Sequence, residues 1–264
     1  MIKENKMTAQ EELSIESPPS KVREVRSFFE DPKRYLRLRG FDVKLRAETV
    51  QEMTDGLAFQ SALDIGCGDG TISLPLLKAG YRLTLLDLST GMTRLASSIV
   101  PAGLERNVEF VNEDFMKANL APDSFDLVIC IGLLAHVDSP ADFLTKVGQV
   151  LKPGGALILE FSDCNHLTSR VLRAYQRICE LRKPRPYPLN FLSARRVRQL
   201  LESRQLRLKS QFRYGLPPFP FINKRLTQDS LYSMVRRVFG NAKRNRNTLL
   251  GNEYILLLTN ERSS

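Results

Sequence analysis

The alternation of short apolar runs with helical patterns constrains the fold of this chain more than any other feature of its sequence. Between residues 61 and 162, runs rich in leucine and β-branched residues recur at intervals that leave room for a connection on either face of a sheet. Such alternation is typical of a parallel sheet covered by helices on both faces. The predicted strands are residues 61–66, 82–88, 108–113, 126–132 and 156–162.

Local signals indicate where the helices between these strands begin and end. The segment 71–80, TISLPLLKAG, is predicted to be a crossover helix that ends at Gly80. Ser89 is expected to cap the next helix, and Ser139, which a proline follows, is a favourable start for another. The sequence LKPGG at 151–155 is expected to end that helix and to lead into the fifth strand.

Two later apolar runs, residues 206–213 and 253–260, are predicted to form an antiparallel pair at one end of the sheet. The expected fold class is α/β: a doubly wound seven-stranded sheet, mostly parallel with an antiparallel last strand, and an α-helical lid or insertion after strand five. Three regions are predicted along the chain. They are a flexible arm at 1–20, an N-terminal helical lid at 21–60, and a ligand-binding domain at 61–264 with a basic insertion at about 164–205 and 214–250.

The positive charge of the chain is concentrated in that insertion. The formal net charge is +10, yet residues 165–247 contain 20 Lys and Arg against three acidic residues. Arginines interleaved with aromatic residues favour RNA binding through phosphates and stacking. An amphipathic helix at 168–182 favours contact with an anionic membrane surface. A solvated arginine face over a lid is the third interpretation.

Other compositional signals favour the reducing cytosol, with peripheral membrane contact as the alternative. No run approaches the roughly 18 apolar residues that a membrane span needs. The first twenty residues are polar and charged, without the apolar core of a signal peptide. The four cysteines lack the CxxC spacing of a zinc site, so neither a metal site nor a disulfide framework is predicted.

Residues suited to a ligand follow the ends of four predicted strands, where the ligand crevice of an open parallel sheet lies. The first strand is followed by glycines that let a ligand approach the backbone. An aspartate after the second strand suits a ribose diol, and an acidic and an aromatic residue after the third suit an amino group and a flat ring. The set consists of Asp64, Gly66, Cys67, Gly68, Asp87, Asp114, Phe115, Ile131 and Gly132.

The acidic residues beside the glycine-rich turn argue against a dinucleotide. The dinucleotide fingerprint requires a third glycine at position 71, where this chain has Thr71. Asp64 and Asp69 add negative potential where a pyrophosphate needs a positive one. A ligand that carries a positively charged amino group and a sulfonium removes this conflict.

Five motifs in order carry a resemblance to a known family: LDIGCGDG, LLDLSTGM, NEDF, FDLVICIGLLAHV and LKPGGALIL. Over residues 61–163 the chain resembles the class I S-adenosylmethionine-dependent methyltransferases, in particular the small-molecule branch that includes the ubiquinone O-methyltransferases. The resemblance implies a Rossmann-like fold and S-adenosyl-L-methionine as the cofactor. It assigns the methionine part to Asp64, Gly66 and Gly68, the ribose to Asp87, and the adenine to Leu88, Met92, Asp114 and Phe115.

His136 is the candidate general base that removes a proton from the acceptor, because histidine titrates near neutral pH. The resemblance places a histidine near the acceptor at this position. A structural role, capping the next helix or filling a polar corner, is the alternative. His166 is a candidate substrate contact, and the resemblance places Tyr35 and Arg46 in a lid helix.

The acceptor is predicted to be a small lipid-like or aromatic molecule that is methylated on oxygen. The fourth strand ends in Cys-Ile-Gly-Leu-Leu, whereas methyltransferases of nucleic-acid amino groups resemble Asn/Asp-Pro-Pro-aromatic there. Two alternatives remain, a methyltransferase that binds RNA through the basic insertion and a non-catalytic cofactor-binding partner subunit. Nucleic acid is the less favoured partner, and the sequence predicts no oligomeric state.

Overall fold

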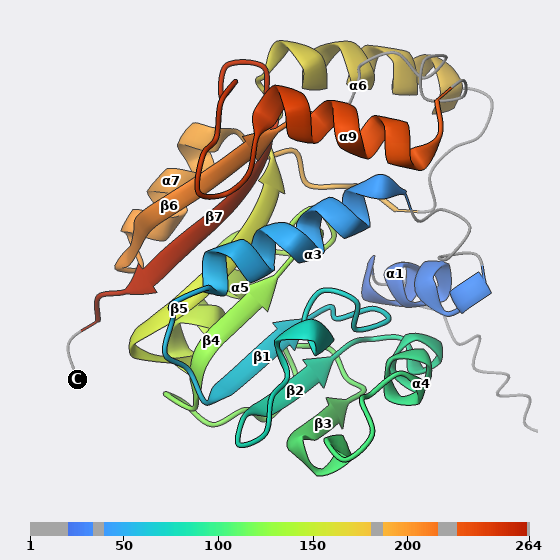
Figure 1. The fold of residues 1–264 in the computed structure, drawn as a ribbon. Coiled ribbons are helices and arrows are strands. Elements are labelled where there is room, and N and C mark those ends of the chain that lie inside the picture. The colour runs from blue at the N-terminus through green and yellow to red at the C-terminus, as the bar shows by residue number, and fades with distance from the viewer. Residues whose placement is uncertain (1–20, 34–39, 181–186, 216–225, 263–264) are drawn as a thin grey trace, which may run out of the picture.

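The computed structural model describes residues 21–33, 40–180, 187–215 and 226–262 of the chain. The predicted arm at 1–20 and the candidate substrate residue Tyr35 lie outside these ranges. The described part forms one twisted sheet with helices packed on both of its faces (Figure 1). In this part, no helix is long and apolar enough to cross a membrane.

The sheet has seven strands in the order β3-β2-β1-β4-β5-β7-β6, which confirms the predicted fold class. Neighbouring strands from β3 to β5 pair in parallel, whereas β7 pairs antiparallel with both β5 and β6. The last strand is therefore inserted between its two predecessors. The strands are β1 (Ser61–Ile65), β2 (Arg82–Leu86), β3 (Val108–Val111), β4 (Phe125–Cys130), β5 (Leu151–Ser162), β6 (Leu206–Tyr214) and β7 (Glu253–Asn260).

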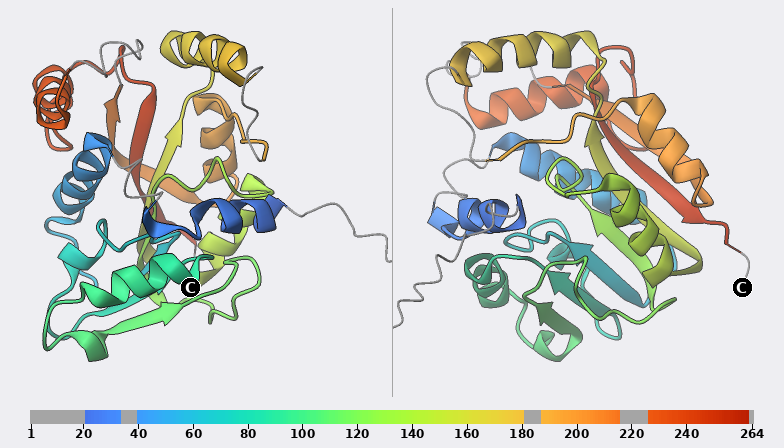
Figure 2. Two further views of the ribbon diagram at one scale, coloured as in Figure 1. Left: turned by 90° about the vertical axis from the view of Figure 1, so that its right-hand side faces the viewer. Right: turned by 180° about the vertical axis from the view of Figure 1, so that it is seen from behind.

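Two helical layers bury the two faces of the sheet (Figures 1 and 2). One face is covered by α5 (Pro140–Val150) and α7 (Ala194–Glu202), and the other by α3 (Phe41–Thr54) and α9 (Gln228–Phe239). Phe143 of α5 and Val197 of α7 belong to one apolar cluster, and Leu45 of α3 and Phe239 of α9 belong to the other. Parts of the predicted basic insertion, α7 and α9, are thus integral to the core.

Three further helices are α1 (Lys21–Phe29), α4 (Thr90–Ser98) and α6 (Leu167–Glu180). Ala96 of α4 belongs to the same apolar cluster as α3 and α9. The predicted caps of two helices are present, because Ser89 Oγ accepts a hydrogen bond from Met92 N at 3.1 Å and Ser139 Oγ accepts one from Asp142 N at 3.3 Å. These helix starts are therefore set by side chains next to them in the sequence.

The predicted crossover helix at 71–80 is wrong. Only a 3₁₀ turn forms there, at Leu74–Leu76, because Pro75 has no N–H to donate to the carbonyl of Thr71. Gly80 has φ +86° but ends a turn and not a helix. The connection from β3 to β4 also consists of turns and contains no helix.

The predicted start of the fifth strand is also wrong. The strand begins at Leu151, directly after α5, and contains the whole LKPGG sequence. Phe125 of β4 pairs with Leu151, and Leu127 pairs with Ala156, so the extra residues of β5 bulge out between the two pairs. Gly154 has φ +75°, a conformation that glycine adopts readily.

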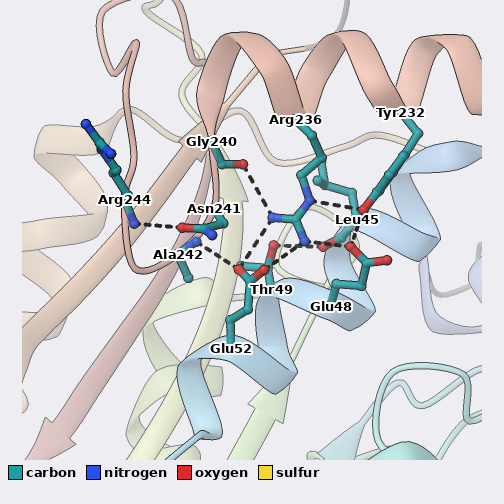
Figure 3. A network of polar contacts seen from close by, with 10 residues as sticks. All are labelled: Leu45, Glu48, Thr49, Glu52, Tyr232, Arg236, Gly240, Asn241, Ala242 and Arg244. Carbon is teal, nitrogen blue, oxygen red and sulfur yellow. Dashed lines mark hydrogen bonds and ion pairs between the residues drawn. The ribbon is translucent and has the colours of Figure 1, made fainter.

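A network of charged residues joins α9 to α3 across a long stretch of the sequence (Figure 3). Arg236 Nη2 lies 2.6 Å from Glu48 Oε2 and 2.9 Å from Glu52 Oε1. Glu52 Oε2 also accepts a hydrogen bond from Ala242 N at 2.9 Å, which holds the segment after α9. Because only 17% of the Arg236 side chain is exposed, this network is better shielded from water than a surface ion pair.

We expect Arg236→Met to lower the free energy of unfolding by about 2 kcal/mol, because two partly buried carboxylates lose their counter-ion. Urea unfolding followed by circular dichroism measures the change. Lys243→Met is the matched control, since Lys243 pairs with Asp55 where about two thirds of both side chains are exposed. Equal midpoints for wild type and Arg236→Met would show that the network contributes nothing to stability.

Candidate functional site

The candidate site lies where β1 and β4 are neighbours in the sheet. From β1 the chain continues to β2 and β3 on one side of β1, and it then crosses to β4 on the other side. The direction in which strands are added to the sheet therefore reverses between β1 and β4. Such a switch point opens a crevice at the carboxyl ends of the strands. A cavity of about 420 Å³ is found there, lined by the loops after β1, β2, β3 and β4 and by α1.

The loop after β1 brings backbone close to this cavity. Gly66 and Gly68 have φ of +71° and +54°, so the turn uses conformations that other residues rarely adopt. A side chain at position 66 would also lie 3.2 Å from Leu133 Cδ1, across the crevice. Gly66, Cys67, Gly68 and Asp69 line the cavity, as expected for a turn that a ligand approaches closely.

Asp87, directly after β2, connects this loop to the next helix. Its Oδ2 accepts a hydrogen bond from Gly68 N and its Oδ1 accepts one from Ser89 N, both at 2.9 Å. Burial raises the pKa of Asp87. Because a carboxylate oxygen can accept more than one hydrogen bond, both oxygens keep capacity for a diol in the cavity.

Asp64 lies below the loop and not on the cavity surface. The residue is 2% exposed, and its Oδ2 has no hydrogen-bond partner in the described part of the chain. Burial outweighs the opposing effect of the nearby Ser73 hydroxyl and, together with the negative charges of Asp87 and Asp69, raises the pKa of Asp64 to about 7. A positively charged group bound above the loop would favour the ionised form of this carboxyl.

The residues that the resemblance assigns to the adenine lie at the same cavity. Leu88, Met92, Asp114 and Phe115 all line it. Phe115 is buried and packs edge-on against Phe143, with ring centroids 5.2 Å apart. Asp114 Oδ1 accepts a hydrogen bond from Met116 N at 3.0 Å. An apolar wall beside an acidic group fits a flat ring that carries an amino group.

His136 follows β4 and lines the same cavity. Its Nδ1 lies 3.0 Å from Tyr187 Oη, and its ring packs against Phe29 with centroids 5.8 Å apart. The direction of the Tyr187 hydrogen bond matters for chemistry. Nε2 can accept a proton only in the neutral tautomer whose Nδ1–H donates to Tyr187 Oη.

The structure brings most of the predicted site residues together and separates two of them, Asp64 and His166, from the cavity lining. Twelve line the cavity: Arg46, Gly66, Cys67, Gly68, Asp87, Leu88, Met92, Asp114, Phe115, Ile131, Gly132 and His136. Asp64 lies beneath it, and Tyr35 lies outside the described residues. Among the described residues, His166 lines neither this cavity nor the one that adjoins it; its Nε2 lies 2.9 Å from the carbonyl oxygen of Leu249, so the arrangement does not support a substrate contact.

Helix α1 lies beside the carboxyl ends of the parallel strands (Figure 1). It falls within the predicted lid at 21–60, but none of its residues that line the cavity was among the predicted site residues. Lys21 Nζ donates to the carbonyl of Val137 at 2.7 Å, and the carbonyl of Phe29 accepts a hydrogen bond from Ser89 Oγ at 3.1 Å. These bonds fix both ends of the helix over the strand ends. The apolar residues Val22, Val25 and Phe29 line the cavity, and their helical spacing was the available signal.

A second cavity of about 280 Å³ adjoins the first. The two cavities share Arg46, Gly132 and His136 as lining residues. The second is otherwise lined by residues 134–135 after β4, by the end of β5, by the start of β7, by the first half of α6 and by residues 189–192. The site therefore has a cofactor-sized chamber and a smaller neighbour that meet after β4.

Comparison with known proteins supports this interpretation at the level of the domain. Residues 63–159 match the family model described as a methyltransferase domain. The chain is 32% identical over 138 residues to a ubiquinone biosynthesis O-methyltransferase of Actinobacillus pleuropneumoniae and 30% identical over 158 residues to that of Stutzerimonas stutzeri. The matches cover 51% and 60% of this chain, and the chain spans 56% and 60% of these relatives.

Solved structures share the fold over a larger part of the chain. The magnesium protoporphyrin IX methyltransferase of Synechocystis, with bound S-adenosylhomocysteine, superposes with a TM-score of 0.60 at 18% identity, covering 92% of this chain and 100% of that one. The [4+2]-cyclase SpnF superposes with a TM-score of 0.56 at 17% identity, over 82% of this chain and 80% of that one. The fold is thus shared by proteins named for different reactions.

We expect Asp64→Asn to stabilise the ligand-free protein at about pH 8, by on the order of 2 to 4 kcal/mol. The pKa of Asp64 is about 7 in the fold and ordinary in the unfolded chain. Because the pKa of Asp64 is higher in the fold, the folded protein binds this proton more tightly than the unfolded chain does. The stabilisation by protonated Asp64 is therefore complete below the pKa of the unfolded chain, near 4, and is lost as pH rises through about 7. The gain should therefore shrink as pH falls, which urea unfolding across pH can measure.

Asp126→Asn is the matched control for this measurement. Although burial opposes it, the pKa of Asp126 is lowered by Lys152, whose Nζ lies 2.7 Å away, and by backbone donors. The same substitution should therefore destabilise the protein at neutral pH. If both variants have a lower free energy of unfolding than wild type at about pH 8, the buried Asp64 carboxylate does not destabilise the folded protein.

Proposed function

Since residues 63–159 match a methyltransferase domain, we propose that the protein transfers the methyl group of S-adenosylmethionine to an oxygen atom of a small molecule. The observation that carries the proposal is the position of Asp87. It ties the glycine loop to the start of α4 and presents its carboxylate to the cavity at the switch point of the sheet. The names of the relatives support O-methylation.

Residues in and beneath the first cavity fit the cofactor in three places. The unpartnered Asp64 Oδ2 below the glycine loop suits the positive charge of the methionine part. Asp87 suits the ribose diol, and the wall that contains Met92 and Phe115 suits the adenine. When bound, S-adenosylmethionine supplies a methyl group that its sulfonium already activates, so the protein has to position the acceptor and remove its proton.

We propose His136 as the group that takes this proton. It lines both cavities, so it stands between the proposed cofactor chamber and the adjoining space. Tyr187 is buried and holds the imidazole from the side of Nδ1, which fixes the direction in which the ring points. A ring held in this way can act as a general base in one tautomer, and the proton moves from the acceptor oxygen to Nε2.

We also propose that α6 contacts an anionic membrane surface. Leu167, Val171 and Tyr175 recur every four residues along the helix and are 72%, 44% and 48% exposed. Leu249 and Leu250 are 85% and 60% exposed, and the hydrogen bond between His166 and Leu249 holds their loop beside the start of α6. Apolar side chains surrounded by arginines fit a lipid interface better than the phosphates of RNA alone.

We expect Asp87→Ala to weaken binding of S-adenosylhomocysteine about a hundredfold, because the hydrogen bonds to the ribose and the anchor of the glycine loop are both lost. Isothermal titration calorimetry measures the affinity. Glu109→Gln on β3 is the control, since this exposed carboxylate does not line the cavity. Unchanged affinity in Asp87→Ala would refute the cofactor site.

We expect His136→Gln to lower turnover by about a hundredfold or more, the usual contribution of general base catalysis. Transfer of a radiolabelled methyl group to an acceptor found by screening phenols gives the rate. The variant should bind S-adenosylhomocysteine as tightly as wild type. Full turnover in His136→Gln would leave the residue with the structural role alone.

We expect the full chain to float with vesicles that contain anionic phospholipid and not with neutral ones. The double variant Leu249→Glu, Leu250→Glu should lose this binding, because acidic side chains repel the lipid surface. Ile99→Glu, at an exposed site on the end of α4, is the control. Binding to single-stranded RNA in a gel shift, without vesicle flotation, would contradict the membrane proposal.

A further inference from the structure

Glu160 near the end of β5 has an unusual environment in the second cavity. The residue is 2% exposed and lines that cavity. Its Oε1 accepts hydrogen bonds from Arg46 Nε and Tyr214 Oη, both at 2.8 Å. Its Oε2 is buried and has no hydrogen-bond partner in the described part of the chain. A charged oxygen without a partner is costly to bury, so it marks a position where a donor is missing.

Gly132 leaves open the space in front of this oxygen. The residue has φ +70° and lines both cavities. The Cβ of any larger residue would lie 3.8 Å from Glu160 Oε2, and no other atom would come within 4 Å of it. The free side of the carboxylate therefore faces the junction between the two cavities.

A second unpartnered acceptor lies in the same cavity. Asn252 is buried, and its Nδ2 donates to Ser169 Oγ at 3.2 Å and to Glu253 Oε1 at 2.7 Å. Its Oδ1 has no hydrogen-bond partner among the described residues. The cavity therefore offers two buried oxygen atoms that can only accept, and both require a ligand that donates hydrogen bonds.

The charges around the cavity favour a neutral donor over an ammonium group. Arg46 neutralises Glu160 through their ion pair at 2.8 Å. Burial and the charge of Glu160 raise the pKa of Glu253 to about 7, and Ser162 Oγ donates to it at 2.5 Å. Arg173 adds a positive charge, stacked over Phe191 at 5.3 Å. The lining carries no excess of negative charge that would attract a cation.

Apolar residues make up much of the remaining lining. They include Leu134, Phe161, Leu172, Leu189, Phe191 and Leu192. Such a lining suits the hydrocarbon or aromatic body of a ligand, while the few polar groups fix its orientation.

We propose that the second cavity receives the methyl acceptor and that Glu160 selects it by accepting a hydrogen bond from a neutral hydroxyl group on an apolar body. The proposal rests on the proposed function, because the second cavity is taken to hold the methyl acceptor. The hydroxyl bound by Glu160 orients the acceptor and is distinct from the oxygen whose proton passes to His136, since a hydroxyl has only one proton to donate. Glu160 is a binding residue in this arrangement and exchanges no proton with the ligand. A carboxylic acid is disfavoured, because its anion would meet the open oxygen of Glu160.

The test uses two probes of nearly the same shape, para-propylphenol and para-propylanisole, which differ in whether the oxygen carries a proton. Calorimetry measures their affinities for wild type, with and without S-adenosylhomocysteine. We expect wild type to bind the phenol about tenfold more tightly than the anisole, the usual effect of one hydrogen bond to a charged group. Equal affinities, or tighter binding of para-propylbenzylamine, would overturn the proposal.

Two variants test whether Glu160 causes the preference for the phenol over the anisole. Glu160→Gln should reduce the preference for phenol to about one, because the amide can present a donor at the open position. Tyr214→Phe is the matched control: it removes a partner of Oε1 and leaves Oε2 open, so the preference should persist. A preference that survives in Glu160→Gln would contradict the assignment.

A third variant tests the location of the phenol even if Glu160→Gln does not fold. Leu172→Trp on α6 should fill the cavity from a partly exposed helix and abolish phenol binding while S-adenosylhomocysteine still binds. Unchanged phenol binding in this variant would place the phenol elsewhere and refute the proposal. Failure of wild type to bind S-adenosylhomocysteine refutes the proposed function, whereas a failure confined to the phenol measurements refutes only the acceptor site.

Discussion

The parallel pairing of β1 with β2 on one side and with β4 on the other decides where every candidate residue of this protein lies. Ala62 and Leu63 of β1 are in register with both neighbours, so the carboxyl ends of the three strands stop at the same edge. The chain leaves this edge toward different sides of the sheet, and the space between the departing loops is the cavity. The glycine turn, Asp87 and His136 meet there because of strand order and not because of proximity in the sequence.

Two buried carboxylates that lack a full set of partners lie at this edge. Asp64 keeps one oxygen without a partner below the proposed cofactor chamber, and Glu160 keeps one facing the proposed acceptor cavity. Burial of such groups opposes folding, and a protein under selection for stability alone would pair or replace them. Their presence at the same edge of the sheet is the expected sign of a site where stability is given up for binding.

Helix α3 links the site to the stability of the fold. Its Arg46 reaches across to Glu160, whereas Glu48 and Glu52, farther along, bind Arg236 of α9 (Figure 3). The same helix therefore holds a buried carboxylate in place and anchors a helix from near the end of the chain. This coupling explains how a segment before the first strand takes part in both the core and the binding site.

Local features of this protein could be predicted from the sequence, because they depend on a few neighbouring residues. The strands before the cavity, the caps at Ser89 and Ser139, and the residues of the glycine loop belong to this class. The prediction of a helix at 71–80 was wrong, because it relied on apolar periodicity and neglected the missing N–H of Pro75. The predicted start of β5 was too late in the sequence, because a Pro-Gly-Gly run usually lies outside a strand and here forms a bulge inside one.

The contacts that define the candidate site chemically were decided only by the tertiary structure. Tyr187 is 51 positions from His136, Tyr214 is 54 positions from Glu160, and Arg46 is 114 positions from Glu160. No periodicity or spacing joins residues so far apart, because their approach depends on strand order and on which face each helix covers. The residues of the proposed cofactor side could be identified from the sequence, because they lie in turns next to strands. The buried carboxyl oxygens without partners could not be identified from it, because burial and nearby donors depend on all the layers that pack around them.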